Sequence, residues 1–245
     1  ATSTVSFSNI NGPASSITVN HYGPYTLRWT ETNGNCSNSS EITITFYEKP
    51  DGCSAGTAPI PVCDALTVAL AGTEHPYLPA PNINSGTQTW SVVSKPGLSS
   101  TVSFSNITSP SSSVTVNHYG SYTLRWTETN GNCSFSPADI TFTFYEKPVA
   151  NAGSDDVINV SLTYTLAAVP YSYEPAPNAN SGTHQWTLLS STTGGTITNW
   201  GTGANTPAPT ITVDKYGDYV LRWTETNGNC TSYENITLKF FIISK

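Results

Sequence analysis

The stretch that decides the fold is VNHYGPYTLRWTETNGNC, residues 19–36, which returns twice with few changes. Residues 116–133 read VNHYGSYTLRWTETNGNC, and residues 213–230 read VDKYGDYVLRWTETNGNC. Successive copies of its tryptophan are 97 residues apart (126 − 29 and 223 − 126): Trp29, Trp126 and Trp223. Solenoid repeats have periods of roughly 20–50 residues, whereas one sandwich domain takes about 100. The period therefore predicts an array of separate domains.

A second repeated motif, FYEKP, places the boundaries between these domains. It ends at Pro50 and again at Pro148, which predicts complete repeats over 51–148 and 149–245. Residues 1–50 begin with a motif, STVSFSN, that recurs in the middle of the next repeat, so we expect them to be the C-terminal half of a truncated repeat. We expect the other half to lie before residue 1, or another chain to supply its strands by donor-strand exchange.

Apolar and polar residues alternate with a period of two in every run, which is typical of half-buried strands. Six or seven short strands in one repeat favour an all-β fold of tandem Ig-like β-sandwiches arranged as an elongated array. The tyrosine that follows YGx is expected to form a tyrosine corner, and a tryptophan in the middle strand is expected to cover the core from the opposite sheet. The predicted repeated core is Tyr25, Leu27, Trp29, Trp90, Tyr122, Leu124, Trp126, Trp186, Tyr219, Leu221 and Trp223.

Composition excludes several classes of function. Only 10% of the 245 residues are charged and the net charge is −7, so the chain lacks the basic footprint that nucleic acids or anionic membranes require. No run approaches the ~18 apolar residues of a membrane span. We therefore expect no nucleic-acid partner, no membrane insertion in this segment and no cofactor.

The five cysteines are interpreted as structural. Cys36, Cys133 and Cys230 occupy one repeated position after the Asn-Gly turn. Assuming that the first strand starts at the same pole as that turn, we expect a disulfide between Cys63 and Cys133, with Cys53–Cys63 as the main competitor. Cys230 is then a free thiol, and the partner of Cys36 lies before residue 1. A bridge in an oxidised, secreted module explains these cysteines better than a metal site, because no CxxC motif is present.

No set of residues predicts catalysis. The four histidines are expected to be exposed turn residues, and the Asp155-Asp156 pair a polar turn rather than a calcium site. Glu31, Glu128 and Glu225 recur three residues after an arginine, which favours a surface ion pair over acid–base chemistry. We therefore expect neither a catalytic residue nor a metal ligand, and we do not expect an enzyme.

Two surface features suggest binding. Tyr77, Tyr171 and Tyr173 stand in proline-rich loops, where exposed rings would stack on sugars. The competing interpretation is a rigid loop whose tyrosines pack against proline rings. Rows of threonine suggest a hydroxyl array for ice or a polymer, but threonine is also simply a good strand former on a solvated face.

Several spaced motifs together resemble a known repeat family. TWSVVSKPG, TVSFSNI, the repeated YGxYxLRWTETNGNC and ITFTFYEKPVANAGSD are similar to the PKD-like or Ig-like repeats of giant Bacteroidetes surface proteins, including gliding-motility adhesins exported by type IX secretion. The resemblance implies an extracellular, cell-surface location and a role as the stalk of a long adhesin. Its partners would be neighbouring repeats of the same chain, and extracellular polysaccharide or surfaces. The alternative function is a polysaccharide-binding module of a secreted protein.

Overall fold

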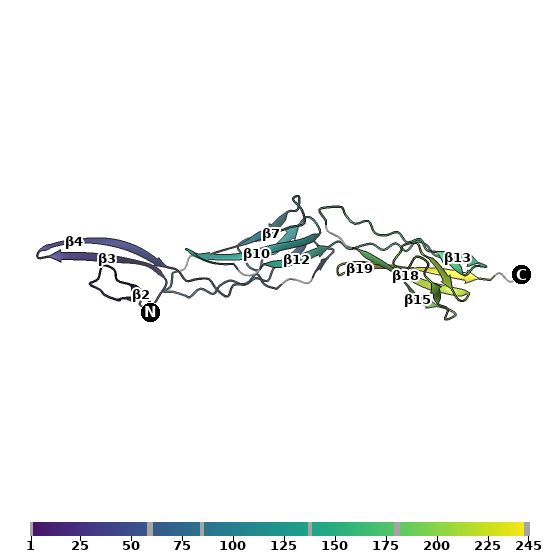
Figure 1. The fold of residues 1–245 in the computed structure, drawn as a ribbon, viewed down its shortest axis with the longest axis horizontal. Coiled ribbons are helices and arrows are strands. Elements are labelled where there is room, and N and C mark those ends of the chain that lie inside the picture. Colours follow the sequence, from purple (N-terminus) through teal and green to yellow (C-terminus); the bar gives the residue numbers. More distant parts are fainter. Residues whose placement is uncertain (1, 58–60, 84–85, 137–138, 179–181, 243–245) are drawn as a thin grey trace.

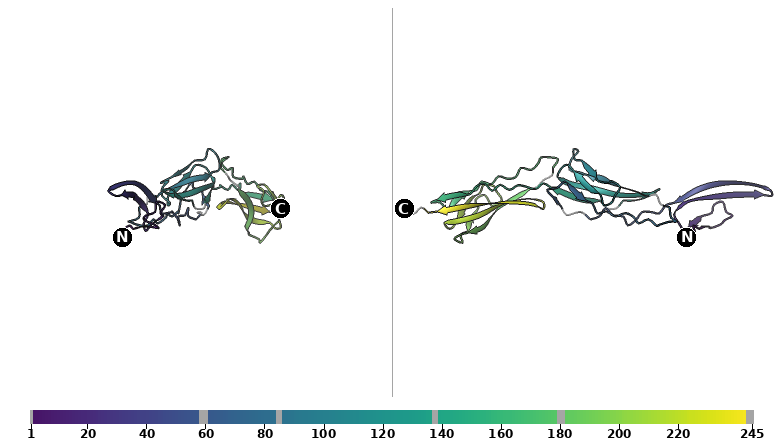
Figure 2. Two further views of the ribbon diagram at one scale, coloured as in Figure 1. Left: turned by 60° about the vertical axis from the view of Figure 1, so that its left-hand side comes forward. Right: turned by 180° about the vertical axis from the view of Figure 1, so that it is seen from behind.

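The computed structural model describes residues 2–57, 61–83, 86–136, 139–178 and 182–242. These residues form nineteen strands, β1 to β19. None of the described residues lies in a helix, and no described segment is a helix long and apolar enough to cross a membrane. The chain is drawn out along one axis, with the N-terminal strands at one end and β19 at the other (Figures 1 and 2). We refer to 1–50, 51–148 and 149–245 as units 1, 2 and 3.

Unit 2 contains two sheets that face each other. In the larger sheet, β10 (Gly120–Asn130) pairs with β11 (Cys133–Phe135) and β12 (Ile140–Tyr145) along one edge and with β7 (Thr87–Ser94) along the other. β12 in turn pairs with β5 (Val62–Cys63). The smaller sheet has the order β6-β9-β8, with bounds Thr67–Ala69, Ser113–Val116 and Val102–Phe104. All neighbours are antiparallel except β5, which pairs with β12 in parallel.

Unit 3 repeats this arrangement. Its larger sheet has the order β13-β19-β18-β15, formed by Asp156–Asn159, Cys230–Phe241, Gly217–Asn227 and Thr183–Ser191. Its smaller sheet has the order β14-β17-β16, formed by Thr163–Thr165, Thr210–Val213 and Ile197–Asn199. The first strand β13 again runs parallel to the last strand β19.

The described residues of unit 1, 2–50, contain only the counterparts of the last four strands of unit 3. β1 (Val5–Phe7) pairs with β2 (Ile17–Val19), and β3 (Gly23–Asn33) pairs with β4 (Cys36–Phe46) in a hairpin that extends from the end of the molecule (Figure 1). Tyr25, Leu27 and Trp29 are therefore only half-buried, and Ile42 is 59% exposed.

Each complete unit has its own apolar core, built around a pair of tryptophans. Trp90 lies opposite Trp126, with ring centroids 5.1 Å apart, and Trp186 lies opposite Trp223 at 5.2 Å. The expectation that Trp90 and Trp186 come from the opposite sheet was wrong, because β7 and β15 hydrogen-bond directly to β10 and β18. The remaining predicted residues of units 2 and 3 are all fully buried: Tyr122, Leu124, Tyr219 and Leu221.

The tyrosine after YGx ties its strand to the loop before it. The Tyr219 hydroxyl donates to the Lys215 carbonyl at 2.8 Å, and the Tyr122 hydroxyl donates to the His118 carbonyl at 2.9 Å. Tyr25 makes the same bond to His21 at 2.8 Å. A tyrosine corner is thus present in every copy.

We predict that Tyr219→Phe lowers the free energy of unfolding of unit 3 by about 1 kcal/mol, because it removes one hydrogen bond at a buried site. Urea unfolding followed by tryptophan fluorescence measures this change. Tyr233→Phe is the matched control, since Tyr233 is 59% exposed and its change should be within about 0.5 kcal/mol of zero. Equal stabilities of the two variants would contradict the prediction.

Candidate functional site at the repeat junctions

The most elaborate polar contacts in the chain lie where one unit meets the next. The β10–β11 hairpin reaches back to unit 1, and the β18–β19 hairpin reaches back to unit 2 (Figures 1 and 2). Each tip is a two-residue Gly-Asn loop, with Gly131 and Gly228 at φ +58° and +59°. Glycine is the residue that adopts this left-handed conformation without strain.

Each tip docks on the tyrosine and glutamate of the preceding FYEKP motif. Asn130 Nδ2 donates to the Glu48 carbonyl at 2.8 Å, and the ring of Tyr47 lies directly against Gly131, where a Cβ would overlap it. The second junction repeats both contacts, with Asn227 bonded to the Glu146 carbonyl at 2.8 Å and Tyr145 against Gly228. The repeated motifs TNGN and FYEKP are therefore the two halves of one interface.

The carboxylate of the same glutamate holds the proline-rich loop of the next unit. Glu48 is 8% exposed and accepts hydrogen bonds from the Leu78 amide at 3.1 Å and from His75 Nε2 at 3.2 Å. Glu146, 6% exposed, accepts from the Glu174 amide at 3.1 Å and the Tyr171 hydroxyl at 3.0 Å. A buried carboxylate is costly unless it is hydrogen-bonded, so each loop is held in place by the charge that it covers.

A second buried carboxylate, from the same unit as the proline-rich loop, also accepts a hydrogen bond from that loop. Glu128 accepts from the His75 amide at 3.1 Å and from Trp126 Nε1 at 2.9 Å. In unit 3, Glu225 accepts from the Tyr171 amide at 2.9 Å and Trp223 Nε1 at 3.0 Å. Each loop therefore links a carboxylate of its own unit to a carboxylate of the preceding unit.

The surface ion pair expected for these glutamates was wrong. Arg125 pairs instead with Asp139 at 2.7 Å, while Arg222 donates to Asn235 and lies over the Tyr233 ring. Glu128 is 3% exposed because it continues the inward face of β10, two residues beyond Trp126.

The end of the loop adds a third contact to each junction. Asn82 Oδ1 accepts from the Tyr22 amide at 2.9 Å, and the Ile83 amide donates to the Tyr22 carbonyl at 3.0 Å. In the second junction, Asn178 Oδ1 accepts from the Tyr119 amide at 2.7 Å. The repeated YG motif therefore also lies at the junction.

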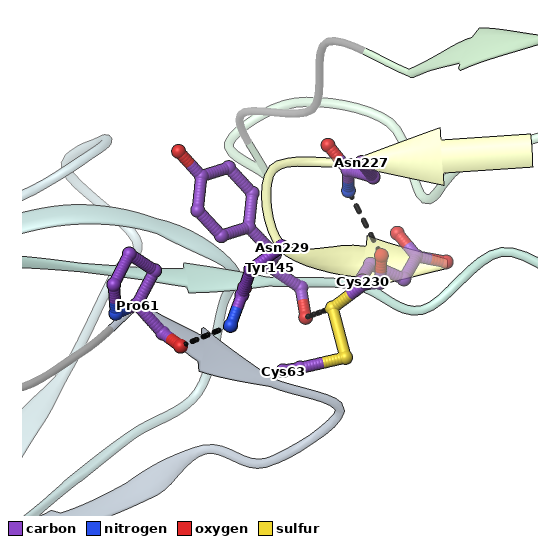
Figure 3. Close-up of a disulfide and its surroundings, with 7 residues drawn as sticks. Pro61, Cys63, Tyr145, Asn227, Asn229 and Cys230 are labelled. Atoms are coloured by element: carbon purple, nitrogen blue, oxygen red, sulfur yellow. Dashed lines mark hydrogen bonds between the residues drawn. A yellow bond between two sulfur atoms is a disulfide. The ribbon is translucent and has the colours of Figure 1, made fainter.

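A disulfide joins units 2 and 3. It links Cys63 on β5 to Cys230 at the tip of β19, with Cα atoms 5.4 Å apart, and Asn229 Nδ2 donates to the Pro61 carbonyl beside it at 2.7 Å (Figure 3). The two cysteines are 167 residues apart in the sequence. A disulfide that closes so long a loop stabilises a fold by about 2–5 kcal/mol.

The predicted Cys63–Cys133 bridge, its competitor Cys53–Cys63 and the free Cys230 were therefore wrong. Because β5 runs parallel to β12, Cys63 pairs with Tyr145 at the exit end of unit 2, whereas Cys133 lies at the opposite pole. The tip that reaches Cys63 is that of the following unit.

The other three cysteines are free thiols. Cys36 is exposed and Cys133 half-buried, each at a hairpin tip. Cys53 belongs to the unit 2 core; burial, aided by the negative charge of Glu128, raises its pKa to about 11. Its thiol is therefore protonated and unreactive at neutral pH.

The tyrosines considered for sugar contact are half-buried residues of the junction loops. The Tyr171 and Tyr173 rings pack edge to face at 4.9 Å, and Tyr77 packs likewise on His75 at 4.5 Å. Tyr77 also lies against Gly86, and Tyr173 against Gly182. They do not form the exposed stacking surface that the glycan interpretation requires.

The remaining candidate residues serve the fold. Within the described ranges, no group of three or more histidines, cysteines or carboxylates is placed to hold a metal ion. Asp155 accepts from the Thr237 amide at 2.7 Å, which holds β13 beside β19. His75 is 9% exposed, so the expectation that it is an exposed turn residue was wrong.

These sheets define a tandem array of Ig-like, PKD-like β-sandwich repeats. No family model matches the chain, and no curated protein matches it. Among solved structures, the PKD domain from human KIAA0319 is similar over 40% of this chain and 85% of its own, with 16% identity and a TM-score of 0.33. Extracellular domains 3–5 of Drosophila OTK match 90% of this chain and 71% of their own (11% identity, TM-score 0.49). An I-band fragment from titin matches 80% and 67% (12% identity, TM-score 0.41).

We predict that Gly228→Ala destabilises unit 3 more than Gly194→Ala does. Both glycines have left-handed φ, +59° and +62°, so both changes carry a backbone cost of about 1–2 kcal/mol. Only Gly228 has a ring against it; nothing lies within 4 Å of a Cβ at Gly194. Overpacking against Tyr145 adds about 1–3 kcal/mol. Urea unfolding compares the two, and equal losses would mean that the ring does not pack on the tip.

We also predict that the first junction loosens as the pH rises, whereas the second does not. Burial alone would lower the pKa of His75, but the Asp51 carbonyl and the Glu48 carboxylate raise it above the ordinary 6.5. The protonated His75 therefore stabilises the first junction fully below pH 6.5. This stabilisation is lost as the pH rises through the higher pKa that His75 has in the folded state.

Hydrogen-exchange protection of the Leu78 amide reports this change, and the Glu174 amide, beside Tyr171 instead of a histidine, is the control in the same molecule. His75→Tyr copies the second junction and should remove the pH dependence. Persistence of that dependence in the variant would show that another group is responsible.

Proposed function

We propose that this chain is a non-enzymatic structural segment, in which rigidly joined repeats form the stalk of a long secreted bacterial surface adhesin. In this role it spaces an adhesive or motility function from the cell. The finer assignment to Bacteroidetes adhesins of the gliding-motility type, exported by type IX secretion, rests on the resemblance of the repeated motifs.

The observation that carries the proposal is the repetition of the junction itself. The same tip, the same tyrosine and the same buried glutamate recur at both junctions, so each added repeat would keep the orientation set by the previous one. Repeated units that contact only their neighbours produce extended, quasi-one-dimensional structures. A stalk needs this property, and an enzyme does not.

An extracellular, cell-surface location is part of the proposal. The Cys63–Cys230 bridge supports it, because structural disulfides persist in oxidising compartments and are rare in the cytosol. We propose that the partners are neighbouring repeats of the same chain. For the polysaccharide-binding alternative, the half-buried tyrosines of the junction loops offer no support.

Small-angle X-ray scattering of the oxidised chain tests the stalk. A compact globule of 245 residues has a radius of gyration of about 18 Å. We predict a much larger value, with a pair-distance distribution skewed to long distances. Cys36→Ser should leave the curve unchanged, since Cys36 is exposed and makes no bridge. A radius of gyration near that of a globule would contradict the proposal.

A further inference from the structure

The tip of the β10–β11 hairpin carries the same four residues as the tip that forms the disulfide. Asn-Gly-Asn-Cys occupies 130–133 in unit 2 and 227–230 in unit 3. The first two residues make the same contacts in both junctions. The last two differ, since Asn229 and Cys230 bond to the β5 segment, whereas Cys133 is a free thiol.

A cysteine that bonds to Cys133 as Cys63 bonds to Cys230 would lie beside β4. In unit 2, β5 lies along β12 at Phe144 and Tyr145, and this contact brings Cys63 to Cys230. β4 is the counterpart of β12, and the described strands give it β3 as its neighbour on one edge and none on the other. Because Tyr47 lies on Gly131 as Tyr145 lies on Gly228, the thiol of Cys133 stands at this open edge.

The apolar face of unit 1 beside this open edge of β4 is not covered by other strands among the described residues. Trp29 is half-buried, and Phe7 and Ile42 are 40% and 59% exposed. In unit 2 the corresponding face is covered by strands of residues 51–97, including Trp90, which is 1% exposed. The segment that fits the edge and the face is therefore one with the residue pattern of 51–97.

We propose that Cys133 is one half of a second inter-repeat disulfide. Its partner is the cysteine that takes the position of Cys63 in a segment with the pattern of residues 51–97, whose first strand adds in parallel to β4 at Phe46 and Tyr47. The Cys63–Cys230 bridge then repeats, at the second junction, a bridge of the same kind at the first junction. Unit 3 does not continue the series, because Asn159 stands on β13 at the position of Cys63. Cys36, at the third Asn-Gly-Asn-Cys tip, belongs to the same series.

The bond forms by two thiol–disulfide exchanges with a small-molecule disulfide such as oxidised glutathione. One cysteine thiolate attacks the disulfide and releases one glutathione thiolate, which gives a mixed disulfide. The second cysteine thiolate then displaces the other glutathione, so the two cysteines lose two electrons and two protons in total and glutathione disulfide gains them. Cys53 does not compete, since burial raises its pKa to about 11 and leaves little thiolate.

The test uses the full chain with a copy of residues 51–97 added in front of Ala1, where Ser3 takes up the repeat at the position of Ser100. The original Cys63 is changed by Cys63→Ser, and the copy of Cys53 is also changed to serine, so that the copy of Cys63 is the only copied cysteine that remains to pair. After refolding in a glutathione buffer, free thiols are alkylated and disulfide-linked peptides are identified by mass spectrometry. The same chain with Cys133→Ser is the control.

We expect the copied cysteine joined to Cys133, near-complete loss of Cys133 alkylation, and an alkylatable Cys230. In the control, the copied cysteine should become alkylatable. An alkylated Cys133, or a link from the copied cysteine to Cys230, would overturn the proposal. The indole ¹H–¹⁵N resonance of Trp29, assigned with Trp29→Phe, shows whether the added segment has covered unit 1. A shifted resonance without the bridge overturns the disulfide alone, and an unshifted one overturns the strand addition as well.

This inference goes beyond the stalk and fails separately from it. The scattering of the unextended chain depends on the junctions already present and not on Cys133. An elongated curve together with an unpaired Cys133 in the extended chain would leave the stalk proposal standing and reject the series of bridges.

Discussion

The arrangement of these repeats depends on a carboxylate that is kept out of water at each junction. Glu48 and Glu146 end one unit, yet they are satisfied largely by amides and side chains of the next unit's loop. If the units separated, each carboxylate would exchange these partners for water, and the loop would lose the acceptor that orders it. Charge-assisted hydrogen bonds are worth more and are more directional than apolar contact, so they set an orientation as well as an affinity.

In the hairpin that meets this carboxylate, one alternating row of inward-facing residues builds both the core of the unit and the junction. From Tyr122 onward, every second residue of β10 faces inward, and all five of them are buried: Tyr122, Leu124, Trp126, Glu128 and Asn130. The first three build the core and the last two build the junction. A change in the core register would therefore displace the junction as well. This coupling explains why the whole stretch returns almost unchanged in three copies, although only part of it lies in the core.

The sequence was sufficient for the repeat, the all-β sandwich fold and the tyrosine corner, because alternation and turn chemistry are local signals. It was insufficient for the disulfide, since the parallel pairing of β5 with β12 is a topological fact that cysteine spacing does not encode. Glu128 and Asn130 carried a signal that was missed: they continue the buried alternation past Trp126, where a surface ion pair had been expected. Glu48 had no such signal, because its burial arises only from contact between units.

The most direct test of this account is the rotational diffusion of units 2 and 3, measured by ¹⁵N relaxation of the chain with Cys63→Ser and Cys230→Ser. Without the covalent bridge, only the docked tip and the shared loop hold the two units together. We predict that one strongly anisotropic diffusion tensor fits the amides of both units. Separate tensors with shorter correlation times for each unit would show that the buried carboxylate does not fix their orientation, and would contradict the account.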